Sequence, residues 1–198
     1  MIDFHEISEK PSQFTEDFRT VQNLYVTLRP LRDDDACRLG NFLKGLSMRT
    51  REFFTYDSFD AKMAQVLCAD INKYDKLRFI LELKKAREII GIFEFSMDLV
   101  KDDIERYASY GITLDVPNTC RYGPVLSDRY QGESIGSLVL SKLMPIIRST
   151  GKSCIILFGG VKAGNRHAIK YYLKNGFCKA GEFVNPEGVR CFDMMRNI

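Results

Sequence analysis

The chain has 198 residues, which is enough for one globular domain. A chain of this length buries roughly 70% of the surface that its unfolded form exposes, so it needs no disulfide or metal for stability. Its content of 45% apolar and 28% charged residues is that of a soluble domain, and a formal net charge of +3 is too small to indicate nucleic-acid binding by itself.

Residues 1–23 form a polar lead-in of uncertain structure. The stretch MIDFHEISEKPSQFTED lacks the apolar segment of a signal peptide, and His5 within it carries no recognisable role. No apolar run in the chain approaches the roughly 20 residues that a membrane-spanning helix needs. We therefore expect one domain over residues 24–198 and no membrane partner.

Periodicity predicts the elements of the first half of this domain. The segment LYVTLRPL alternates apolar and polar residues, which predicts a strand that stops near Pro30. Residues 33–35 are aspartates that supply the N-cap and the acidic first turn of a helix reaching about Leu46, and a second helix is predicted over residues 60–74. The apolar runs LRFILEL and EIIGIFEFSM, separated by KKARE, predict a hairpin.

The second half of the domain alternates strands with helices. After an acidic insertion over residues 98–118, TCRYGPVL predicts a strand, and a helix follows over about residues 134–150. SCIILFGGV is the most apolar strand, residues 165–176 form a helix ended by a glycine, and FCKAGEF and VRCFDMM close the chain as a hairpin. This order predicts an α/β (α+β) fold, with a mixed sheet covered by helices on both faces.

The cysteines indicate neither disulfides nor a metal site. None of them forms a C-x-x-C pair, and the chain has only two histidines, so we expect no zinc. Several lie in apolar runs, where a free thiol packs as a small hydrophobe. We expect reduced thiols and a cytoplasmic protein. The six cysteines are Cys37, Cys68, Cys120, Cys154, Cys178 and Cys191.

The stretch GESIG, residues 132–136, matches two different motifs. As G-x-S-x-G it is the nucleophile elbow of a serine hydrolase, with Ser134 as the nucleophile. That motif needs a strand running directly into the serine, followed by an acid and then a histidine. A polar turn precedes Ser134, and no acid lies between it and the one downstream histidine, His167. The hydrolase is therefore the remote alternative.

In the second interpretation the same residues open a helix and hold a phosphate. The first N–H groups of a helix have no intrahelical partner and lie at the positive end of its dipole. Small side chains let a diphosphate approach these groups, although ordinary helix starts also contain small residues. The stretch fits neither G-x-G-x-x-G nor the Walker pattern.

Two motifs in order resemble the GNAT superfamily of acyl-CoA-dependent N-acyltransferases. The family's pyrophosphate loop runs Gln/Arg-x-x-Gly-x-Gly/Ala, and here Gln131 and Gly136 match it while Ser134 replaces the first glycine. The family's later helix reads Asn-x-x-Ala-(Ile/Leu)-x-x-Tyr-x-x-x-Gly-Phe, which residues 165–177 match at every fixed position. The resemblance covers residues 24–195 and implies a single-domain GNAT-like fold with a mixed, mostly antiparallel central sheet.

The resemblance implies an acetyltransferase that moves an acetyl group from acetyl-CoA to a primary amine. The backbone of the loop and helix start would hold the pyrophosphate, and the strand before it would pair with the pantetheine arm. Arg129 and Arg166 could meet phosphates or be ordinary surface arginines. The implied cofactor-binding residues are Val125, Leu126, Gln131, Gly132, Glu133, Ser134, Ile135, Gly136, Ser137, Asn165 and Tyr172.

By the same resemblance, Tyr172 would be the general acid that protonates the departing thiolate of coenzyme A. A core tyrosine is the plain alternative for Tyr172, and a simple N-cap is the alternative for Asn165. Tyr171 points about 100° away from Tyr172 on a helix and is expected to be structural. Many family members place a glutamate on the strand here read as TCRYGPVL, which has no acid. Glu94 is the remaining candidate base, against a solvated outward-facing glutamate or a water relay.

The acceptor is not identified by the sequence. The acidic insertion could attract a cationic amine, or it could be a solvated loop. We expect a small-molecule or peptide amine acceptor, no nucleic acid, and a monomer or homodimer. A coenzyme A-binding regulatory module without turnover is the alternative function.

Overall fold

The structure is a computed structural model that describes residues 1–54, 56–69 and 75–198. It divides into two compact units. The N-terminal unit consists of Ile2–Glu94 and Pro124–Ser141, and the C-terminal unit consists of Phe95–Gly123, Lys142–Ile198 and Met1. Three elements, β4, β5 and α6, contribute residues to both units.

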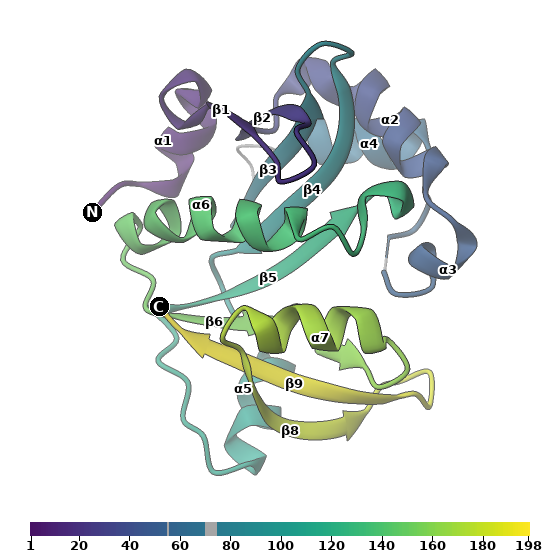
Figure 1. Ribbon diagram of the computed structural model, residues 1–198. Coiled ribbons are helices and arrows are strands. Elements are labelled where there is room, and N and C mark those ends of the chain that lie inside the picture. Colours follow the sequence, from purple (N-terminus) through teal and green to yellow (C-terminus); the bar gives the residue numbers. More distant parts are fainter. Residues whose placement is uncertain (55, 70–74) are drawn as a thin grey trace. The chain divides into compact units, whose positions relative to one another are not determined.

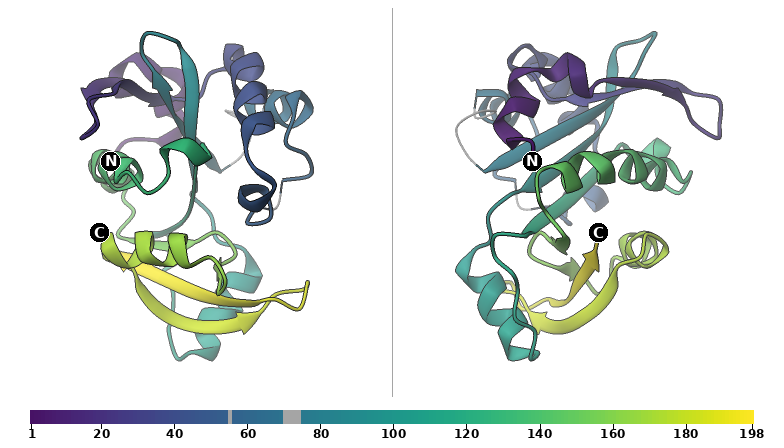
Figure 2. Two further views of the ribbon diagram at one scale, coloured as in Figure 1. Left: turned by 45° about the vertical axis from the view of Figure 1, so that its right-hand side comes forward. Right: turned by 90° about the vertical axis from the view of Figure 1, so that its left-hand side faces the viewer.

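The N-terminal unit is built on strands in the order β1-β2-β3-β4, with the end of β5 beside β4 (Figure 1). Pairs β1–β2 and β2–β3 are antiparallel. Helices α2 and α4 lie side by side against β3 and β4 (Figures 1 and 2). The elements are α1 (Phe4–Glu9), the 3-10 turn η1 (Pro11–Phe14), β1 (Glu16–Arg19), β2 (Tyr25–Pro30), η2 (Asp33–Asp35), α2 (Ala36–Gly45), α3 (Met48–Arg51), α4 (Ala61–Ala69), β3 (Lys76–Leu83), β4 (Glu88–Ser96), β5 (Thr119–Leu126), η3 (Asp128–Tyr130) and α6 (Ile135–Ser149).

The C-terminal unit has the strand order β5-β6-β9-β7, with β8 paired to β9. The β5–β6 pair is parallel, whereas β9 is antiparallel to β6, β7 and β8. Helices α5 and α7 lie on opposite faces of β8 and β9 (Figure 2). Its further elements are α5 (Lys101–Ser109), β6 (Cys154–Leu157), β7 (Val161–Lys162), α7 (Arg166–Lys174), β8 (Cys178–Val184) and β9 (Arg190–Asn197).

Each unit has its own apolar core. In the N-terminal unit, Leu39 and Leu43 of α2 pack with Leu67 of α4 on Ile80 and Ile92 of the sheet. In the C-terminal unit, Tyr107 of α5 packs on Cys154 and Ile156 of β6. The predicted mixed, mostly antiparallel sheet with helices on both faces is confirmed.

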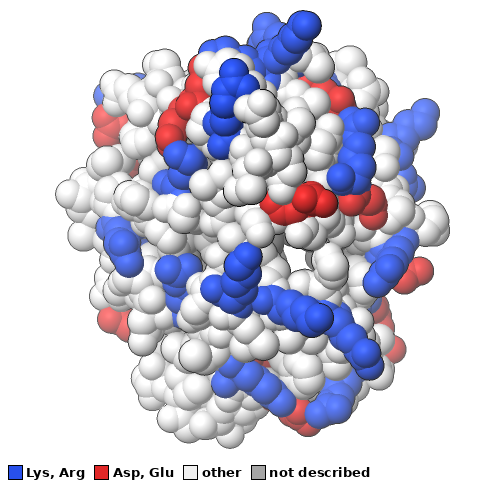
Figure 3. All heavy atoms as spheres, viewed as in Figure 1, with Lys and Arg blue, Asp and Glu red and all other residues white. Residues whose placement is uncertain are grey.

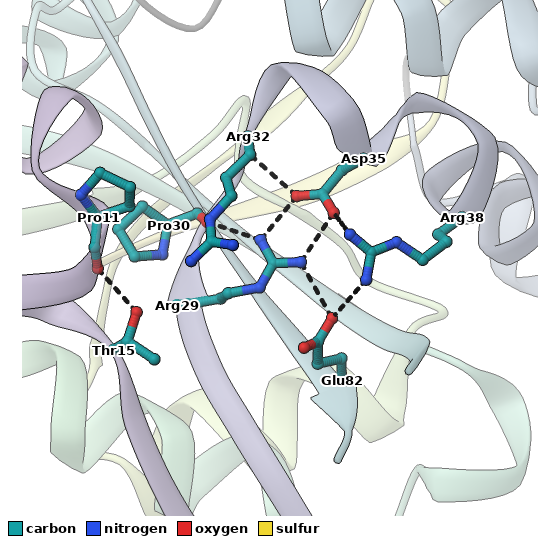
Figure 4. A network of polar contacts seen from close by, with 8 residues as sticks. All are labelled: Pro11, Thr15, Arg29, Pro30, Arg32, Asp35, Arg38 and Glu82. Carbon is teal, nitrogen blue, oxygen red and sulfur yellow. Dashed lines mark hydrogen bonds and ion pairs between the residues drawn. The ribbon is translucent and has the colours of Figure 1, made fainter. Parts of the chain in front are cut away.

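An ion network ties the end of β2 to β3 and the start of α2 (Figure 4). The Arg29 guanidinium is almost fully buried and donates to both carboxylate oxygens of Asp35 at 2.7 Å, to Glu82 at 3.0 Å and to the Pro30 carbonyl at 3.1 Å. Arg38 adds a hydrogen bond to Glu82 at 3.1 Å. Arg29, Arg38, Asp35 and Glu82 each have a partner of opposite charge, which is the condition for burying ions without a large loss of stability.

Several predicted boundaries differ from the structure for local reasons. The lead-in contains α1 and β1, and β1 pairs with β2. SCIILFGGV is broken after Leu157, because Gly159 and Gly160 have φ angles of 62° and 72° and end the strand. The helix predicted over residues 60–74 is α4, and positions 70–74 lie outside the described residues. No helix of the described chain has the length and apolar character needed to cross a membrane.

Candidate functional site

The turn between β5 and α6 has a backbone that few side chains tolerate. After β5 ends at Leu126, η3 leads into residues 131–134, where Gly132 has φ 83° and Ser134 has φ 59°. Both angles lie in the left-handed region, which glycine adopts freely and other residues adopt at a cost. This conformation explains why the family pattern has glycine where this chain has Ser134.

Backbone N–H groups at this turn are open to an anion. The structure records no hydrogen bond from the N–H groups of Gly132, Glu133 and Ile135 to any described residue. Gly132, Glu133 and Ser134 are exposed, and Ile135 begins a 15-residue helix. Unpaired N–H groups at the positive end of a helix dipole form an anion site.

Side chains of this turn hold it in place. Gln131 Nε2 donates to the Leu126 carbonyl at 2.9 Å and to Thr50 Oγ1 at 3.3 Å. Gln22 Nε2 donates to the Glu133 carbonyl at 2.8 Å and to its carboxylate at 2.9 Å. The side chains predicted at positions 131 and 133 therefore fix the turn, which leaves the N–H groups of Gly132, Glu133 and Ile135 for a ligand.

Three further residues, which sequence reasoning missed, fasten α3 to this turn. The Ser47 N–H and hydroxyl donate to Asp128, the N–H at 2.9 Å and the hydroxyl at 2.5 Å, and the Thr50 hydroxyl donates to Asp128 at 2.6 Å. Burial acts to raise the pKa of Asp128, but these hydrogen bonds outweigh it and lower that pKa below its ordinary value. The available signal was Ser47 three residues before Thr50, a helix N-cap pattern whose partner at Asp128 is distant in sequence.

On the strand before the turn, part of the backbone is already engaged. Val125 is buried in the core of the N-terminal unit, and the Leu126 carbonyl accepts the Gln131 side chain. The Ser127 N–H donates to the Ile90 carbonyl of β4 at 2.8 Å. The Leu126 carbonyl and the Ser127 N–H are therefore already paired within the protein.

Of the two arginines near the motifs, Arg129 is paired with an acid and Arg166 is exposed. Arg129 forms an ion pair with Glu88 and lies over the Tyr130 ring at 4.9 Å. Arg166 is exposed at the start of α7, with Lys170 and Lys174 following at four-residue intervals. Lys and Arg side chains gather over α7 in the space-filling view (Figure 3).

Asn165 and Tyr172 lie at opposite ends of α7. Asn165 Oδ1 accepts the Ala168 N–H at 3.1 Å, so the N-cap interpretation of this residue is confirmed, and its Nδ2 has no recorded partner in the described part of the chain. The Tyr172 side chain is 7% exposed, and its ring meets Phe177 and Tyr171 edge-on at 5.3 and 5.1 Å. Burial raises the pKa of Tyr172 well above its ordinary value, which keeps the phenol protonated.

Tyr171 has a structural partner, as predicted. Its hydroxyl lies 2.8 Å from the hydroxyl of Tyr122 on β5. Burial raises the pKa of both phenols, so both are neutral at physiological pH. This bond joins α7 to β5 within the C-terminal unit.

Glu94 is not the solvated, outward-facing residue of the plain alternative. It is 9% exposed on β4 and accepts from Arg78 Nε of β3 at 2.6 Å. Glu94 belongs to the same strand face as Ile92, which packs under α2 and α4. The alternation of β4 therefore places this carboxylate on the covered face of the sheet.

The acidic insertion contains the nine-residue helix α5 (Lys101–Ser109), and one acid of this helix faces inward. Asp103 of α5 is 1% exposed and accepts from Arg106 at 2.6 Å, while Arg106 also donates to Asp193 of β9 at 2.9 Å. The solvated-loop interpretation is therefore wrong for Asp103, whereas Asp98, Asp102, Glu105 and Asp115 are exposed.

The nucleophile-elbow geometry is not formed. β5 ends at Leu126, and η3 separates it from Ser134, so no strand runs into that serine. His167 is an exposed residue of the first turn of α7. Within the described residues, no three His, Cys, Asp or Glu side chains are grouped to hold a metal ion.

Comparison with known families gives a direct match. A family model described as "Acetyltransferase (GNAT) family" matches residues 46–177. This range contains both the turn between β5 and α6 and the whole of α7. No curated protein matched the chain in sequence.

Solved structures similar to this chain share its fold. The GNAT domain of S. lividans PAT is 17% identical with a TM-score of 0.73, and the match covers 95% of this chain and 99% of that one. The ribosomal-protein-S5-alanine acetyltransferase from Vibrio fischeri is 15% identical with a TM-score of 0.71, covering 92% and 96%. The aminoglycoside acetyltransferase AAC(6')-Ib in complex with coenzyme A and kanamycin is 20% identical with a TM-score of 0.64, covering 87% and 94%.

Proposed function

The chain belongs to the acetyltransferase (GNAT) family, and on that premise we propose that it transfers the acetyl group of acetyl-CoA to a primary amine. The observation that carries this proposal is the turn over residues 131–136. In this turn Gly132 and Ser134 have left-handed backbone angles, and α6 begins directly after them at Ile135. Such a turn fits a diphosphate and needs no lysine or metal ion for the purpose.

By the resemblance to the family, three parts of the chain would hold coenzyme A. The main chain of residues 131–137 would hold the pyrophosphate, with the Ser134 hydroxyl as an additional donor. Val125 and Leu126 would run beside the pantetheine arm. The Asn165 side chain caps α7 through Oδ1, so its Nδ2 is left to donate to an amide carbonyl of the cofactor. Arg166, Lys170 and Lys174 add positive charge along α7.

The thioester supplies an activated acetyl group, and the protein's part is positioning and proton transfer. The neutral amine attacks the thioester carbonyl, so a C–N bond forms, the C–S bond breaks and the thiolate leaves. Tyr172, which burial keeps protonated at neutral pH, would give its proton to that thiolate, although the same burial makes the phenol a weaker acid. The ammonium form of the acceptor must first lose a proton, to Glu94 or to water. Holding both reactants together contributes much of the acceleration.

The test is binding of acetyl-CoA to the wild-type protein and to Gly136→Glu. Gly136 is buried at the start of α6, where a carboxylate would occupy the expected diphosphate position and repel it. We expect wild type to bind and the variant to lose at least 100-fold in affinity, about 2.7 kcal/mol. Ser137→Glu, at a less buried position, should also weaken binding and serves if Gly136→Glu does not fold.

The matched control is Gly45→Glu, because Gly45 ends α2 and a side chain there meets no atom within 4 Å. It should bind as wild type does. Release of free thiol when amines are added then separates a transferase from a module that binds coenzyme A without turnover. Unchanged affinity in both charged variants of the α6 start would refute the proposed site.

A further inference from the structure

Two buried arginines of the N-terminal unit differ in how their guanidinium groups are satisfied. The Arg29 guanidinium donates hydrogen bonds to four acceptors from three residues (Figure 4). Arg78 makes one recorded side-chain hydrogen bond within the described residues, from Nε to Glu94 Oε2 at 2.6 Å. Its Nη1 is buried and has no partner there. A buried charged donor without an acceptor is costly, and such groups are expected to meet a ligand or water.

One carboxylate oxygen of Glu94 is likewise without a recorded hydrogen bond from the described residues. Its Oε2 accepts from Arg78, and no hydrogen bond to Oε1 is recorded from the described chain. The two side chains are 7% and 12% exposed and come from adjacent strands, β3 and β4. A buried cationic donor without a partner and a carboxylate oxygen without a recorded protein donor therefore belong to one ion pair on the covered face of the sheet.

Three partly buried aromatic side chains, Phe54, Tyr56 and Phe59, pack against the core cluster that contains Ile80 of β3 and Ile92 of β4. Tyr56 lies within electrostatic range of both charges, since burial and Glu94 raise its pKa while Arg78 acts to lower it. Its ring is 6.2 Å from that of Phe54 and 5.8 Å from that of Phe59. Within the described residues, no hydrogen bond of the Tyr56 hydroxyl is recorded.

The chain connects this place to the proposed cofactor turn. Asp128 and Gln131 of that turn bind Ser47 and Thr50 at the start and within α3. Phe54 follows three residues after the end of α3 and packs against the core cluster that contains Ile80 of β3 and Ile92 of β4. The two places are thus linked through one short helix of the same unit.

We propose that Arg78 and Glu94 bind the acceptor, and that the acceptor is an α-amino acid. Arg78 Nη1 donates to its carboxylate, Glu94 Oε1 accepts from its ammonium group, and the aromatic residues 54, 56 and 59 contact its side chain. The pair recognises a zwitterion because the cation, Arg78, can bind the carboxylate of the ligand and the anion, Glu94, can bind its ammonium group. This inference rests on the proposed acetyl transfer and specifies its substrate class.

The experiment compares acceptors that differ only in the carboxylate. Leucine, phenylalanine and histidine are each assayed with acetyl-CoA against their carboxamides and their decarboxylated amines. We expect at least one amino acid to exceed both analogues by roughly 30-fold or more in kcat/KM, as is typical when a buried charged hydrogen bond loses its partner. Equal or better transfer to the amides or amines in all three sets would overturn the inference and leave the acetyltransferase proposal standing.

The variant Arg78→Lys keeps a cation beside Glu94 and removes Nη1. We expect the preference for the amino acid to fall to about 3-fold or less while the KM for acetyl-CoA is unchanged. The control Arg49→Lys changes an exposed arginine of α3 and should keep the wild-type preference. Retention of the full preference in Arg78→Lys would contradict the assignment.

A binding measurement covers the case in which Arg78→Lys does not fold. Calorimetric titration of wild type, saturated with coenzyme A, should show binding of the preferred amino acid and at least 10-fold weaker binding of its carboxamide. Absence of binding by all three amino acids would overturn the inference. If acetyl-CoA itself does not bind, the proposed function fails instead.

Discussion

At the scale of the residue, the Tyr172 hydroxyl is the group on which proton transfer depends. Replacing it with phenylalanine removes the proton donor and keeps the ring packing on Phe177. We expect kcat to fall roughly 100- to 10,000-fold, the usual contribution of a general acid, with acetyl-CoA affinity changed by less than about 3-fold. Stopped assays for kcat and calorimetry for affinity make this separation.

Its neighbour provides the control for that prediction. Tyr171→Phe breaks the 2.8 Å hydroxyl contact with Tyr122 and leaves Tyr172 intact. It should lower stability by about 1 kcal/mol, the value of an ordinary hydrogen bond, with kcat retained. Equal kcat for wild type and Tyr172→Phe would remove Tyr172 from the chemistry.

Ser134 pays a conformational penalty for its φ of 59°. The left-handed region costs a residue with a Cβ roughly 1–2 kcal/mol, whereas glycine adopts it freely but loses more entropy on folding. Ser134→Gly should therefore leave stability unchanged or raise it by up to about 1 kcal/mol, with acetyl transfer retained. Denaturant unfolding and the transfer assay test both points, and loss of all activity would instead support a nucleophilic serine. Ser134→Val, which is β-branched, should destabilise the turn.

At the scale of the element, α5 and α2 bury aspartates with opposite effects on pH-dependent stability. Burial raises the pKa of Asp103 on α5, and Arg106 and Arg121 offset this only in part. A raised folded-state pKa means that stability falls as pH rises through it, so the charged form is unfavourable at neutral pH. Asp103→Asn should therefore change the melting temperature less unfavourably at pH 7 than near pH 4, because the variant no longer carries the cost of ionising this carboxyl.

Asp35, at the start of α2, is the opposing control. Burial acts to raise its pKa, but Arg29 and Arg38 outweigh it and the pKa is lowered. The stability that ionised Asp35 contributes is fully present above the ordinary aspartate pKa, and it is lost as the pH falls through the pKa of Asp35 in the folded protein. Asp35→Asn should cost about 3–5 kcal/mol at pH 7, because it leaves Arg29 buried beside a neutral partner. Thermal melts of both variants across pH 4–7 distinguish the two signs.

What the sequence could predict at this scale was set by local pattern. The 15 residues of α6 and the nine of α7 were found to within about two residues, because their apolar spacing and caps are local. α1 and β1 were missed since β1 is held by pairing with β2 and its sequence EDFR has no strand periodicity. The β6 strand was overextended because its glycines were read as part of an apolar run.

Some residues of the candidate site could likewise be predicted from the local sequence, and others could not. The cofactor turn follows a contiguous pattern, so its residues could be named from the sequence. The Arg78–Glu94 pair depends on the register of β3 and β4, and the contacts of Asp128 with Ser47 and Thr50 span 81 and 78 positions. Long-range contacts of this kind leave no local signal.

At the scale of the whole molecule, the six free thiols report on unfolding of each unit. Cys37 and Cys178 are exposed, whereas Cys68 lies in the N-terminal unit and Cys120, Cys154 and Cys191 lie buried in the C-terminal unit. Burial raises the pKa of Cys68 to about 11 and of Cys120 to about 12, which leaves little reactive thiolate at pH 8. Iodoacetamide should therefore label two thiols of the native protein quickly and all six in denaturant.

The rates of the four slow thiols test whether the units unfold together. Because β4, β5 and α6 contribute residues to both, opening either unit disrupts strands of the other. We expect Cys68 and Cys120 to be labelled at equal rates, read by mass spectrometry of their peptides. Acetyl-CoA at 100 times its Kd stabilises the folded state by about 2.7 kcal/mol and should slow both rates roughly 100-fold when labelling follows the unfolding equilibrium. If acetyl-CoA slows the labelling of Cys68 but not that of Cys120, the N-terminal unit with the cofactor turn and the C-terminal unit with Tyr172 unfold independently. The elements that both units share would then not couple their unfolding.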